Sequence, residues 1–167
     1  MTLDDLNAAD AHAFAAALDG VFEHSPWIAA RTFAARPFAS VAALHDALVA
    51  TVERATTDEQ LALLRAHPEL AGKAAIARAL TPSSTCEQAS AGLDACTPQQ
   101  FAELGALNER YRERFGFPFI IAVRGLDRGQ IIAALAQRVT RTRDAEFSEA
   151  LAQVARIARL RLDALLT

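Results

Sequence analysis

The sequence lacks the features that usually mark metal sites, nucleic-acid-binding domains and membrane spans. Only two of its 167 residues are cysteines, Cys86 and Cys96. They have no CxxC spacing and no histidine near them in the sequence, so a structural zinc site is not expected. The formal net charge of −3 at pH 7 gives no electrostatic reason to expect nucleic acid or an anionic membrane as a partner. No segment approaches the roughly 20 apolar residues that a membrane span needs.

Targeting signals are also missing from the two ends of the sequence. Residues 1–5 are acidic and lack the basic start and apolar stretch of a secretory signal. The last three residues, Leu165, Leu166 and Thr167, are not a peroxisomal address of the Ser-Lys-Leu kind. We therefore expect a cytoplasmic protein of bacterial type, with both cysteines as reduced thiols and a disulfide as the alternative.

The composition that is present favours helix. Hydrophobic residues make up 52% of the chain, many of them alanine, and charged residues make up 22%. Alanine has the best intrinsic helix propensity because it loses no side-chain rotamer freedom. A chain of this length typically forms one domain. The sequence therefore predicts a single compact all-α domain over residues 1–167, with about eight helices.

Helix boundaries are predicted from capping residues and from apolar residues spaced three and four apart. Ser25 with Pro26 and Thr97 with Pro98 combine a cap with a proline at the first helical position. Gly116 is the expected stop of the helix that Thr97 starts. The predicted helices run over residues 8–19 (capped by Asn7), 26–36, 41–52 (opened by Ser40), 58–67 (with a capping box from Thr57 to Gln60), 84–95 (with a capping box from Ser84 to Glu87), 98–115, 128–142 (started by Asp127 with Gln130) and 144–166.

Residues 117–123 form the one strand-like run, which is apolar and partly β-branched. The sequence has no second run to pair with it, and a lone strand would leave its amides unpaired. We predict an extended buried connector whose main-chain groups need other partners. A bound ligand could be one of them.

His67 is the first candidate for acid/base chemistry. It follows an amphipathic helical stretch, and Pro68 forbids the helix to continue normally through it. Histidine is the side chain best suited to exchange a proton near neutral pH, although a lone histidine at a helix end usually only complements the helix dipole. The sequence alone favours a capping role for Glu87, but the start of its helix could also bind an anion. Arg161 belongs to a series with Arg156 and Arg159 that is typical of a solvated face.

Several motifs taken together identify a family that no single motif would. The chain resembles the 2-oxo-4-hydroxy-4-carboxy-5-ureidoimidazoline (OHCU) decarboxylases, which act in urate breakdown, over essentially its whole length. The motifs occur in one order and are Phe22-Glu23-His24-Ser25-Pro26-Trp27, His67-Pro68-Glu69-Leu70-Ala71-Gly72, Ser84-x-x-Glu87-Gln88 with Ala91-Gly92-Leu93, Leu107-Asn108-x-x-Tyr111, the run from Phe115 to Gly125, and the run from Ile157 to Leu162.

This resemblance implies an enzyme, a carboxy-lyase that converts OHCU to (S)-allantoin and carbon dioxide without metal or organic cofactor. His67 corresponds to the family's catalytic histidine, the expected proton donor that fixes the S configuration, and Glu87 is expected to orient it. The segment from Ser84 to Cys86 is expected to offer amides at a helix start. The residues that the resemblance assigns to substrate binding are Pro68, Ser84, Thr85, Cys86, Glu87, Gln88, Phe119, Ile120, Ile121, Ala122, Val123 and Arg161.

The resemblance also implies the partners of the chain. The expected partner is the small-molecule substrate, and a homodimer is expected because members of the family are generally homodimers. Two alternatives stay open at this point. The chain could be a non-catalytic helical interaction module that kept the fold, or a decarboxylase of a related ureido or imidazoline acid.

Overall fold

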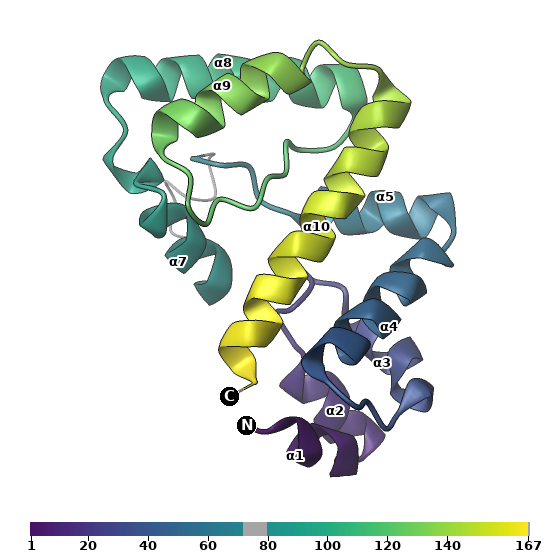
Figure 1. Cartoon of the computed structure of the whole chain (residues 1–167). Helices are drawn as coiled ribbons and strands as arrows, with labels where there is room; N and C mark the ends of the chain where they lie inside the picture. The colour runs from purple at the N-terminus through teal and green to yellow at the C-terminus, as the bar shows by residue number, and fades with distance from the viewer. Residues whose placement is uncertain (72–79, 167) are drawn as a thin grey trace. The chain divides into compact units, whose positions relative to one another are not determined.

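In a computed structural model that describes residues 1–71 and 80–166, every regular element is a helix, apart from one isolated bridge between Asp19 and Phe22 (Figure 1). The all-α prediction is therefore confirmed. Gly72, which ends the motif that begins at His67, and Thr167 lie outside the described residues. The elements are α1 (Leu3–Ala8), α2 (Ala11–Ala17), α3 (Pro26–Thr32), the 3₁₀ helix η1 (Phe33–Ala35), α4 (Val41–Glu53), α5 (Thr57–Ala66), α7 (Pro82–Ser90), the 3₁₀ helix η2 (Leu93–Ala95), α8 (Pro98–Phe115), α9 (Arg128–Arg138) and α10 (Arg143–Leu165).

The predicted helix starts at Ser40, Thr97 and Asp127 are confirmed by the cap that each makes. Helix α3 also begins at Pro26 as predicted, but the Ser25 side chain makes no capping hydrogen bond. The Ser40 side chain accepts a hydrogen bond from the Ala43 amide at the start of α4. Thr97 and Asp127 each form a capping box with a glutamine three residues later. Because such side chains satisfy amides that have no partner inside the helix, they fix where the helix begins. Gly116 ends α8 with a φ of +80°, a conformation that glycine adopts without strain.

The first predicted helix is wrong. Residues 8–19 do not form one helix capped by Asn7; Thr2 caps α1 and Asp10 caps α2 instead. Asn7 lies inside α1, where its side-chain amide donates to the Phe38 carbonyl (2.9 Å) and accepts from the Phe38 amide (2.8 Å). The residue that looked like a cap serves a long-range contact.

Further boundaries differ from the prediction. The helix predicted over residues 26–36 ends at Thr32, and the 3₁₀ helix η1 follows it. The capping box of α5 joins Thr56 and Glu59, one residue earlier than predicted. Helix α7 begins at Pro82 because Thr81 caps it, and it ends at Ser90, so the predicted helix 84–95 is shifted and broken. Helix α9 ends at Arg138 instead of residue 142, since the Thr140 hydroxyl donates back to the Gln137 carbonyl in a turn.

The chain divides into two units. The first unit comprises residues 1–66 and 155–166 of the described chain, and the second comprises residues 67–71 and 80–154. A single domain over residues 1–167 stays a prediction.

Apolar side chains from α1, α2, α3, α4 and α5 form the core of the first unit. Helix α3 contacts both α2 and α4. Phe14 packs edge-on against Phe33 with ring centroids 5.6 Å apart. The fully buried side chains of this core include Leu6, Phe14, Ile28, Leu44, Leu48, Leu63 and Leu64.

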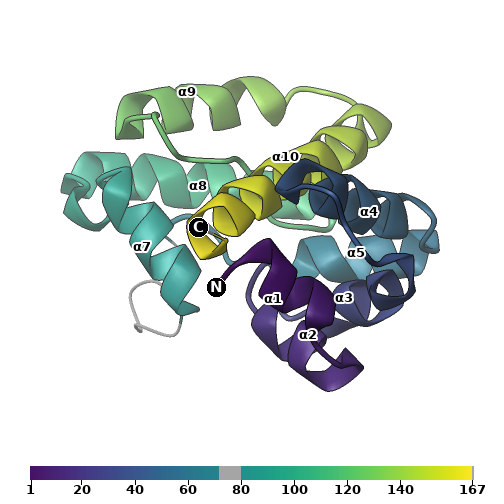
Figure 2. The same cartoon turned by 60° about the horizontal axis from the view of Figure 1, so that its bottom comes forward.

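An aromatic cluster forms the core of the second unit. Helices α8 and α9 contact each other and run side by side in both views (Figures 1 and 2). The ring of Tyr111 on α8 meets those of Phe115, Phe117 and Phe119 at centroid distances of 4.5, 6.0 and 5.5 Å. Residues 118–123 form no helix, strand, turn or bend. The predicted extended connector between α8 and α9 is therefore confirmed, and the aromatic cluster anchors its first half.

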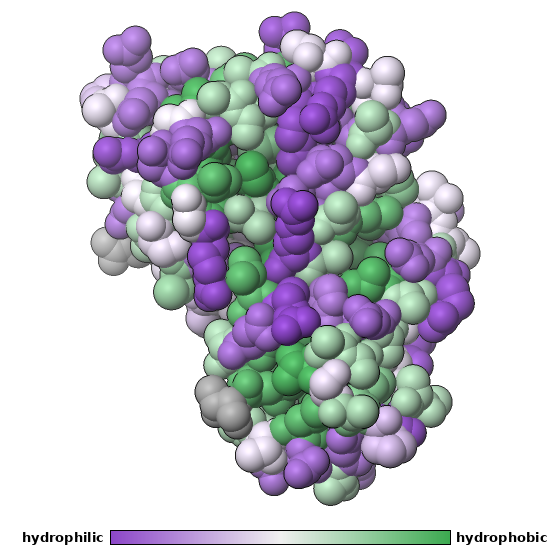
Figure 3. Space-filling model, viewed as in Figure 1, coloured by the Kyte–Doolittle hydropathy of each residue, from purple (hydrophilic) through white to green (hydrophobic). Residues whose placement is uncertain are grey.

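The surface carries few large apolar side chains. Among the described residues, Met1 and Phe101 are the exposed ones, and the face in Figure 3 intersperses hydrophilic with hydrophobic residues. No described helix combines the length and the apolar composition required to cross a membrane.

Candidate functional site

His67 lies at the first position after α5 and is buried. The helix ends at Ala66, as the proline at position 68 predicts. His67 is only 7% exposed. Pro68 beside it is half-buried. A buried imidazole at the end of a helix can meet a ligand away from bulk water, which is what an acid/base group needs to act selectively.

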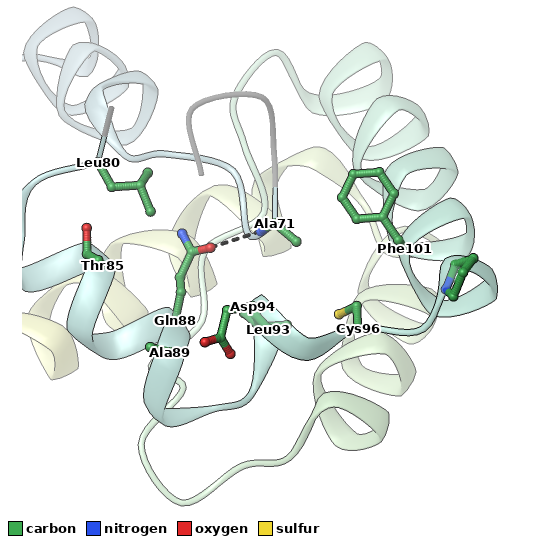
Figure 4. A pocket seen from close by; sticks show the side chains of 10 residues that line it. Ala71, Leu80, Thr85, Gln88, Ala89, Leu93, Asp94, Cys96 and Phe101 are labelled. Carbon is green, nitrogen blue, oxygen red and sulfur yellow. Dashed lines mark hydrogen bonds between the residues drawn. The ribbon is translucent and has the colours of Figure 1, made fainter. Parts of the chain in front are cut away.

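The loop that follows His67 is held by the side chain of Gln88 on α7. The Ala71 amide donates to Gln88 Oε1 over 2.9 Å (Figure 4), and Gln88 Nε2 donates to the Glu69 carbonyl over 3.4 Å. Ala71 has a φ of +49°, a left-handed conformation that costs an alanine free energy. Gln88 therefore stabilises a strained backbone four residues after His67. The sequence did not predict this role.

Helix α8 holds the same loop from another side. Asn108 is buried, and its Nδ2 donates to the Leu70 carbonyl over 2.9 Å. Arg112 forms an ion pair with Glu69. The loop after His67 is thus bonded by α7 and α8 at consecutive residues, and this fixes the main chain next to the imidazole.

Helix α7 carries the predicted segment from Ser84 to Gln88. Ser84 and Gln88 are buried, Glu87 is half-buried, and Thr85 and Cys86 are exposed. The expectation that residues 84–86 offer amides at a helix start is wrong, because the helix begins at Pro82. The Ser84 amide already donates to the Thr81 hydroxyl (3.3 Å) and the Thr85 amide to the Thr81 carbonyl (2.9 Å).

A pocket of about 460 Å³ opens beside α7 in the second unit. This volume lies in the range of small-molecule sites. Gln88 and Thr85 are the predicted site residues that line it, and Ala71 of the His67 loop joins them (Figure 4). Its other lining residues are Leu80, Ala89, Leu93, Asp94, Cys96, Pro98 and Phe101.

The connector of residues 117–123 is bonded at two of the five predicted binding residues. The Ile120 carbonyl accepts a hydrogen bond from Arg138 Nη1 on α9 over 2.8 Å. The Ala122 amide donates to Gln153 Oε1 on α10 over 2.9 Å. Phe119, Ile120 and Val123 are buried, whereas Ile121 and Ala122 are half-buried.

A buried polar network holds Arg138. Its Nε donates to Glu146 Oε2 over 2.9 Å, and the Tyr111 hydroxyl donates to the same oxygen over 2.6 Å. Burial, and then the hydrogen bond to Glu146, raise the pKa of Tyr111, so the phenol keeps the proton that it donates. Arg141 lies 3.5 Å from the other carboxylate oxygen.

Arg161 belongs to the first unit, where it is buried. Its Nη2 donates to Glu23 Oε1 over 3.0 Å and its Nη1 to the Gly20 carbonyl over 2.9 Å. Sequence alone favoured a solvated face for the arginines of this helix. That interpretation fits Arg156, which is exposed, and is wrong for Arg161.

Sequence reasoning missed the residues that hold this architecture. Glu23 and Asn108 lie in the motifs that carry the family resemblance. Their position in these motifs was a signal, but the sequence analysis assigned no role to either residue. Arg138, Glu146 and Gln153 gave no signal, because a charged or polar residue on an amphipathic helix is usually solvated.

No described group of three histidine, cysteine, aspartate or glutamate side chains could hold a metal ion. Cys86 is exposed, Cys96 is half-buried, and both are free thiols as expected.

The chain matches the family model described as OHCU decarboxylase over residues 7–163. It is 44% identical to the 2-oxo-4-hydroxy-4-carboxy-5-ureidoimidazoline decarboxylase of Halalkalicoccus jeotgali, over 99% of this chain and 92% of that protein. It is also 42% identical to the uric acid degradation bifunctional protein PucL of Bacillus subtilis, over 99% of this chain and 33% of that protein.

Two solved structures share the fold. A crystal structure of (S)-allantoin synthase superposes with a TM-score of 0.77 and 31% identity, over 99% of this chain and 54% of that chain. A crystal structure of an OHCU decarboxylase in the presence of (S)-allantoin gives a TM-score of 0.71 over 87% of this chain and 94% of that chain. At 23% identity, the second match concerns the fold alone.

Proposed function

Because this chain belongs to the OHCU decarboxylase family, we propose that it decarboxylates OHCU to (S)-allantoin in urate degradation. The observation that carries the proposal is the buried His67 at a helix end, with its loop fixed at successive residues by Gln88 and Asn108. Such a group is placed to deliver a proton to one face of a bound heterocycle.

The substrate supplies its own electron sink. The carbon that bears the carboxylate also carries a hydroxyl group and adjoins an imine carbon. When the bond to carbon dioxide breaks, its electron pair moves toward the imine, whose nitrogen takes a proton, and an enol remains. The enol then loses its hydroxyl proton and gains a proton on the neighbouring carbon. In sum, the substrate anion takes up one proton and releases carbon dioxide.

His67 would deliver the proton to the carbon that becomes the stereocentre. General acid/base help of this kind typically accelerates a reaction by about 10²–10⁴-fold. Glu87, half-buried on α7, would orient the imidazole and accept hydrogen bonds from ureido or ring N–H groups. Delivery from one side yields a single enantiomer, whereas the uncatalysed reaction has no such preference.

The remaining predicted residues would hold the substrate. The main-chain groups of residues 119–123 and the side chain of Gln88 would bind the planar, hydrogen-bonding ring, and Pro68 would close the pocket against it. Ser84, Thr85 and Cys86 would contact the substrate from within α7. They would not do so through amides at a helix start, because the helix begins earlier than predicted. Arg161 would hold an anionic or carbonyl oxygen of the substrate.

A homodimer in the cytoplasm completes the proposal. The dimer is supported by the general habit of the family and by the exposed Phe101, a side chain that association would cover. The cytoplasm is supported by two free thiols in one chain, which are typical of a reducing compartment.

The rate and handedness of allantoin formation from freshly generated OHCU test this function. The purified chain is expected to accelerate formation of the S enantiomer. Circular dichroism monitors this reaction. His67→Asn is expected to lower kcat/KM by about 10²–10⁴-fold while the far-ultraviolet helix signal is kept. His45→Asn is the matched control, because His45 is a half-buried histidine of the first unit whose Nε2 contacts the Ala155 carbonyl. Stereoselective turnover by His67→Asn at the wild-type rate would remove the mechanism.

A further inference from the structure

The connector of residues 117–123 has two edges, and one of them is bonded to the protein. In an extended backbone, neighbouring residues direct their main-chain groups to opposite sides, so residues two apart share an edge. Ile120 and Ala122 therefore lie on one edge, which we call the anchored edge. The hydrogen bonds to this edge come from side chains of the following helices, Arg138 on α9 and Gln153 on α10.

The opposite edge runs through Phe119, Ile121 and Val123. The Val123 carbonyl accepts a hydrogen bond from the Leu126 amide over 3.0 Å, so the part that we call the open edge comprises Phe119 and Ile121. Within residues 1–71 and 80–166, neither residue makes a main-chain hydrogen bond. Phe119 is only 1% exposed and Ile121 is half-buried. Buried main-chain donors and acceptors without partners are costly and are normally completed by water or by a ligand.

We propose that Arg138 and Gln153 are positioning residues, which hold the anchored edge so that the open edge meets the substrate. The inference rests on the proposed function, in which residues 119–123 bind the substrate. It adds two residues that do not themselves touch the ligand. They act by fixing the direction in which the amides and carbonyls of Phe119 and Ile121 point.

The Arg138 network fixes the position of the connector more than it stabilises the fold. Arg138 is 4% exposed and Glu146 is 0% exposed, and such buried pairs are often no more stabilising than apolar residues of the same volume. Glu146 fixes the guanidinium through Nε, which leaves Nη1 directed at the Ile120 carbonyl. The guanidinium carbon also lies 4.7 Å from the centre of the Phe119 ring. One arginine thus holds both the main chain and a side chain of the connector.

Replacement of the whole network separates positioning from stability. The variant Arg138→Met/Glu146→Leu/Tyr111→Phe removes the charges and the hydroxyl together, so no buried charge is left without a partner. We expect kcat/KM for OHCU to fall by about 10–100-fold, mostly through a higher KM, because the open edge is no longer held in place. Arg156→Met is the matched control, an exposed arginine on α10.

Gln153→Met tests the other anchor without removing a charged side chain. It removes the acceptor of the Ala122 amide and keeps the volume of the side chain. It also removes the hydrogen bond that Gln153 Nε2 donates to Glu149 Oε1 over 2.7 Å. Amide hydrogen exchange gives a readout that general destabilisation does not move in the same way. In the wild type we expect saturating (S)-allantoin to slow exchange at Phe119 and Ile121, and to change Ala122 little because its amide is already bonded. In Gln153→Met we expect Ala122 to exchange faster and the protection by allantoin to be reduced.

The outcomes distinguish this inference from the proposed function. A wild-type chain that does not accelerate decarboxylation overturns both. An active wild type, with variants that keep the wild-type KM and the same allantoin protection at Ile121, overturns the positioning role alone. If the triple variant does not fold, the KM and exchange pattern of Gln153→Met decide the question.

Discussion

Two buried arginines bind in nearly the same way in the two units. In the first unit, Arg161 pairs with Glu23 and donates to the Gly20 carbonyl. In the second, Arg138 pairs with Glu146 and donates to the Ile120 carbonyl. Each arginine therefore joins a carboxylate to a main-chain carbonyl outside the regular helices, so the same chemistry fixes irregular backbone twice.

The two pairs differ in the distance along the chain that they join. Arg161 and Glu23 are 138 residues apart, whereas Arg138 and Glu146 are 8 apart. The first pair ties the last helix to the amino-terminal helices, and the second secures a local connector. Glu146 also accepts from Tyr111, so the second pair belongs to a larger network. In the functions proposed above, Arg161 binds the substrate and Arg138 positions the connector.

Breaking the second pair by removing its carboxylate should give the largest loss of stability. Glu146→Ala leaves the buried Arg138 guanidinium without its counter-charge, which typically costs about 3–5 kcal/mol. Chemical denaturation measures the change in the free energy of unfolding. Glu109→Ala, at an exposed position of α8, should change it by no more than about 0.5 kcal/mol. An unfolding free energy for Glu146→Ala equal to that of the control would show that the network does not hold the second unit.

Replacing the first pair should affect activity more than stability. Arg161→Met with Glu23→Leu removes both charges at once, so the fold should be kept. If Arg161 holds a substrate oxygen, kcat/KM should fall by about 10²-fold, equivalent to about 2.7 kcal/mol of transition-state binding. Steady-state kinetics beside a thermal unfolding curve measure both effects. Full activity in a folded double variant would contradict the difference drawn between the two arginines.

Removing the Tyr111 hydroxyl tests the size of the second network. Tyr111→Phe takes one donor from Glu146, and a hydrogen bond to a charged group contributes about 1.5–3 kcal/mol. The raised pKa of Tyr111 means that its contribution is complete below its ordinary value of 10.0 and is lost as the pH rises above it. The gap in unfolding free energy between Tyr111→Phe and wild type should therefore be about 1.4 kcal/mol smaller at about pH 11 than at pH 8. An equal gap at both pH values would contradict a buried hydroxyl that must lose its proton.

The surface pair of Arg31 and Glu59 should show the smallest effect. The hydrogen bond from Arg31, and then that from the Thr56 amide, lower the pKa of Glu59 to about 2 from its ordinary value of 4.5. A lowered pKa stabilises the fold above the ordinary value, and this contribution is lost as the pH falls toward about 2. Glu59→Gln should reduce the loss of thermal stability between these pH values, whereas Glu109→Gln should leave it unchanged. Identical acid profiles for Glu59→Gln and wild type would remove Glu59 from this account.

Local signals in the sequence were enough for most of the fold. Ser40, Thr97 and Asp127 start their helices as predicted because a cap acts over three residues. The wrong helix starts predicted at Asn7 and Ser84 arise because local signals were not enough there. Several residues near each of these sites could cap, and the choice between them depends on contacts with residues far along the chain.

The candidate site was predictable to a smaller extent. His67 could be singled out from its own chemistry and from Pro68, and the connector from the lack of a partner strand. Asn108 and Arg138 could not, because their roles come from the carbonyls of Leu70 and Ile120 that the fold brings to them. Residues that bind main-chain groups far along the chain leave no local pattern in the sequence.

A crystal structure of the chain with (S)-allantoin tests the central claim most directly. The account predicts that a nitrogen of the His67 imidazole lies within about 3.2 Å of the ligand or of one bridging water. It also predicts that main-chain groups of Phe119 or Ile121 bond the ring of the ligand. Allantoin bound in a site that the imidazole does not face, with the open edge of the connector still unbonded, would contradict it.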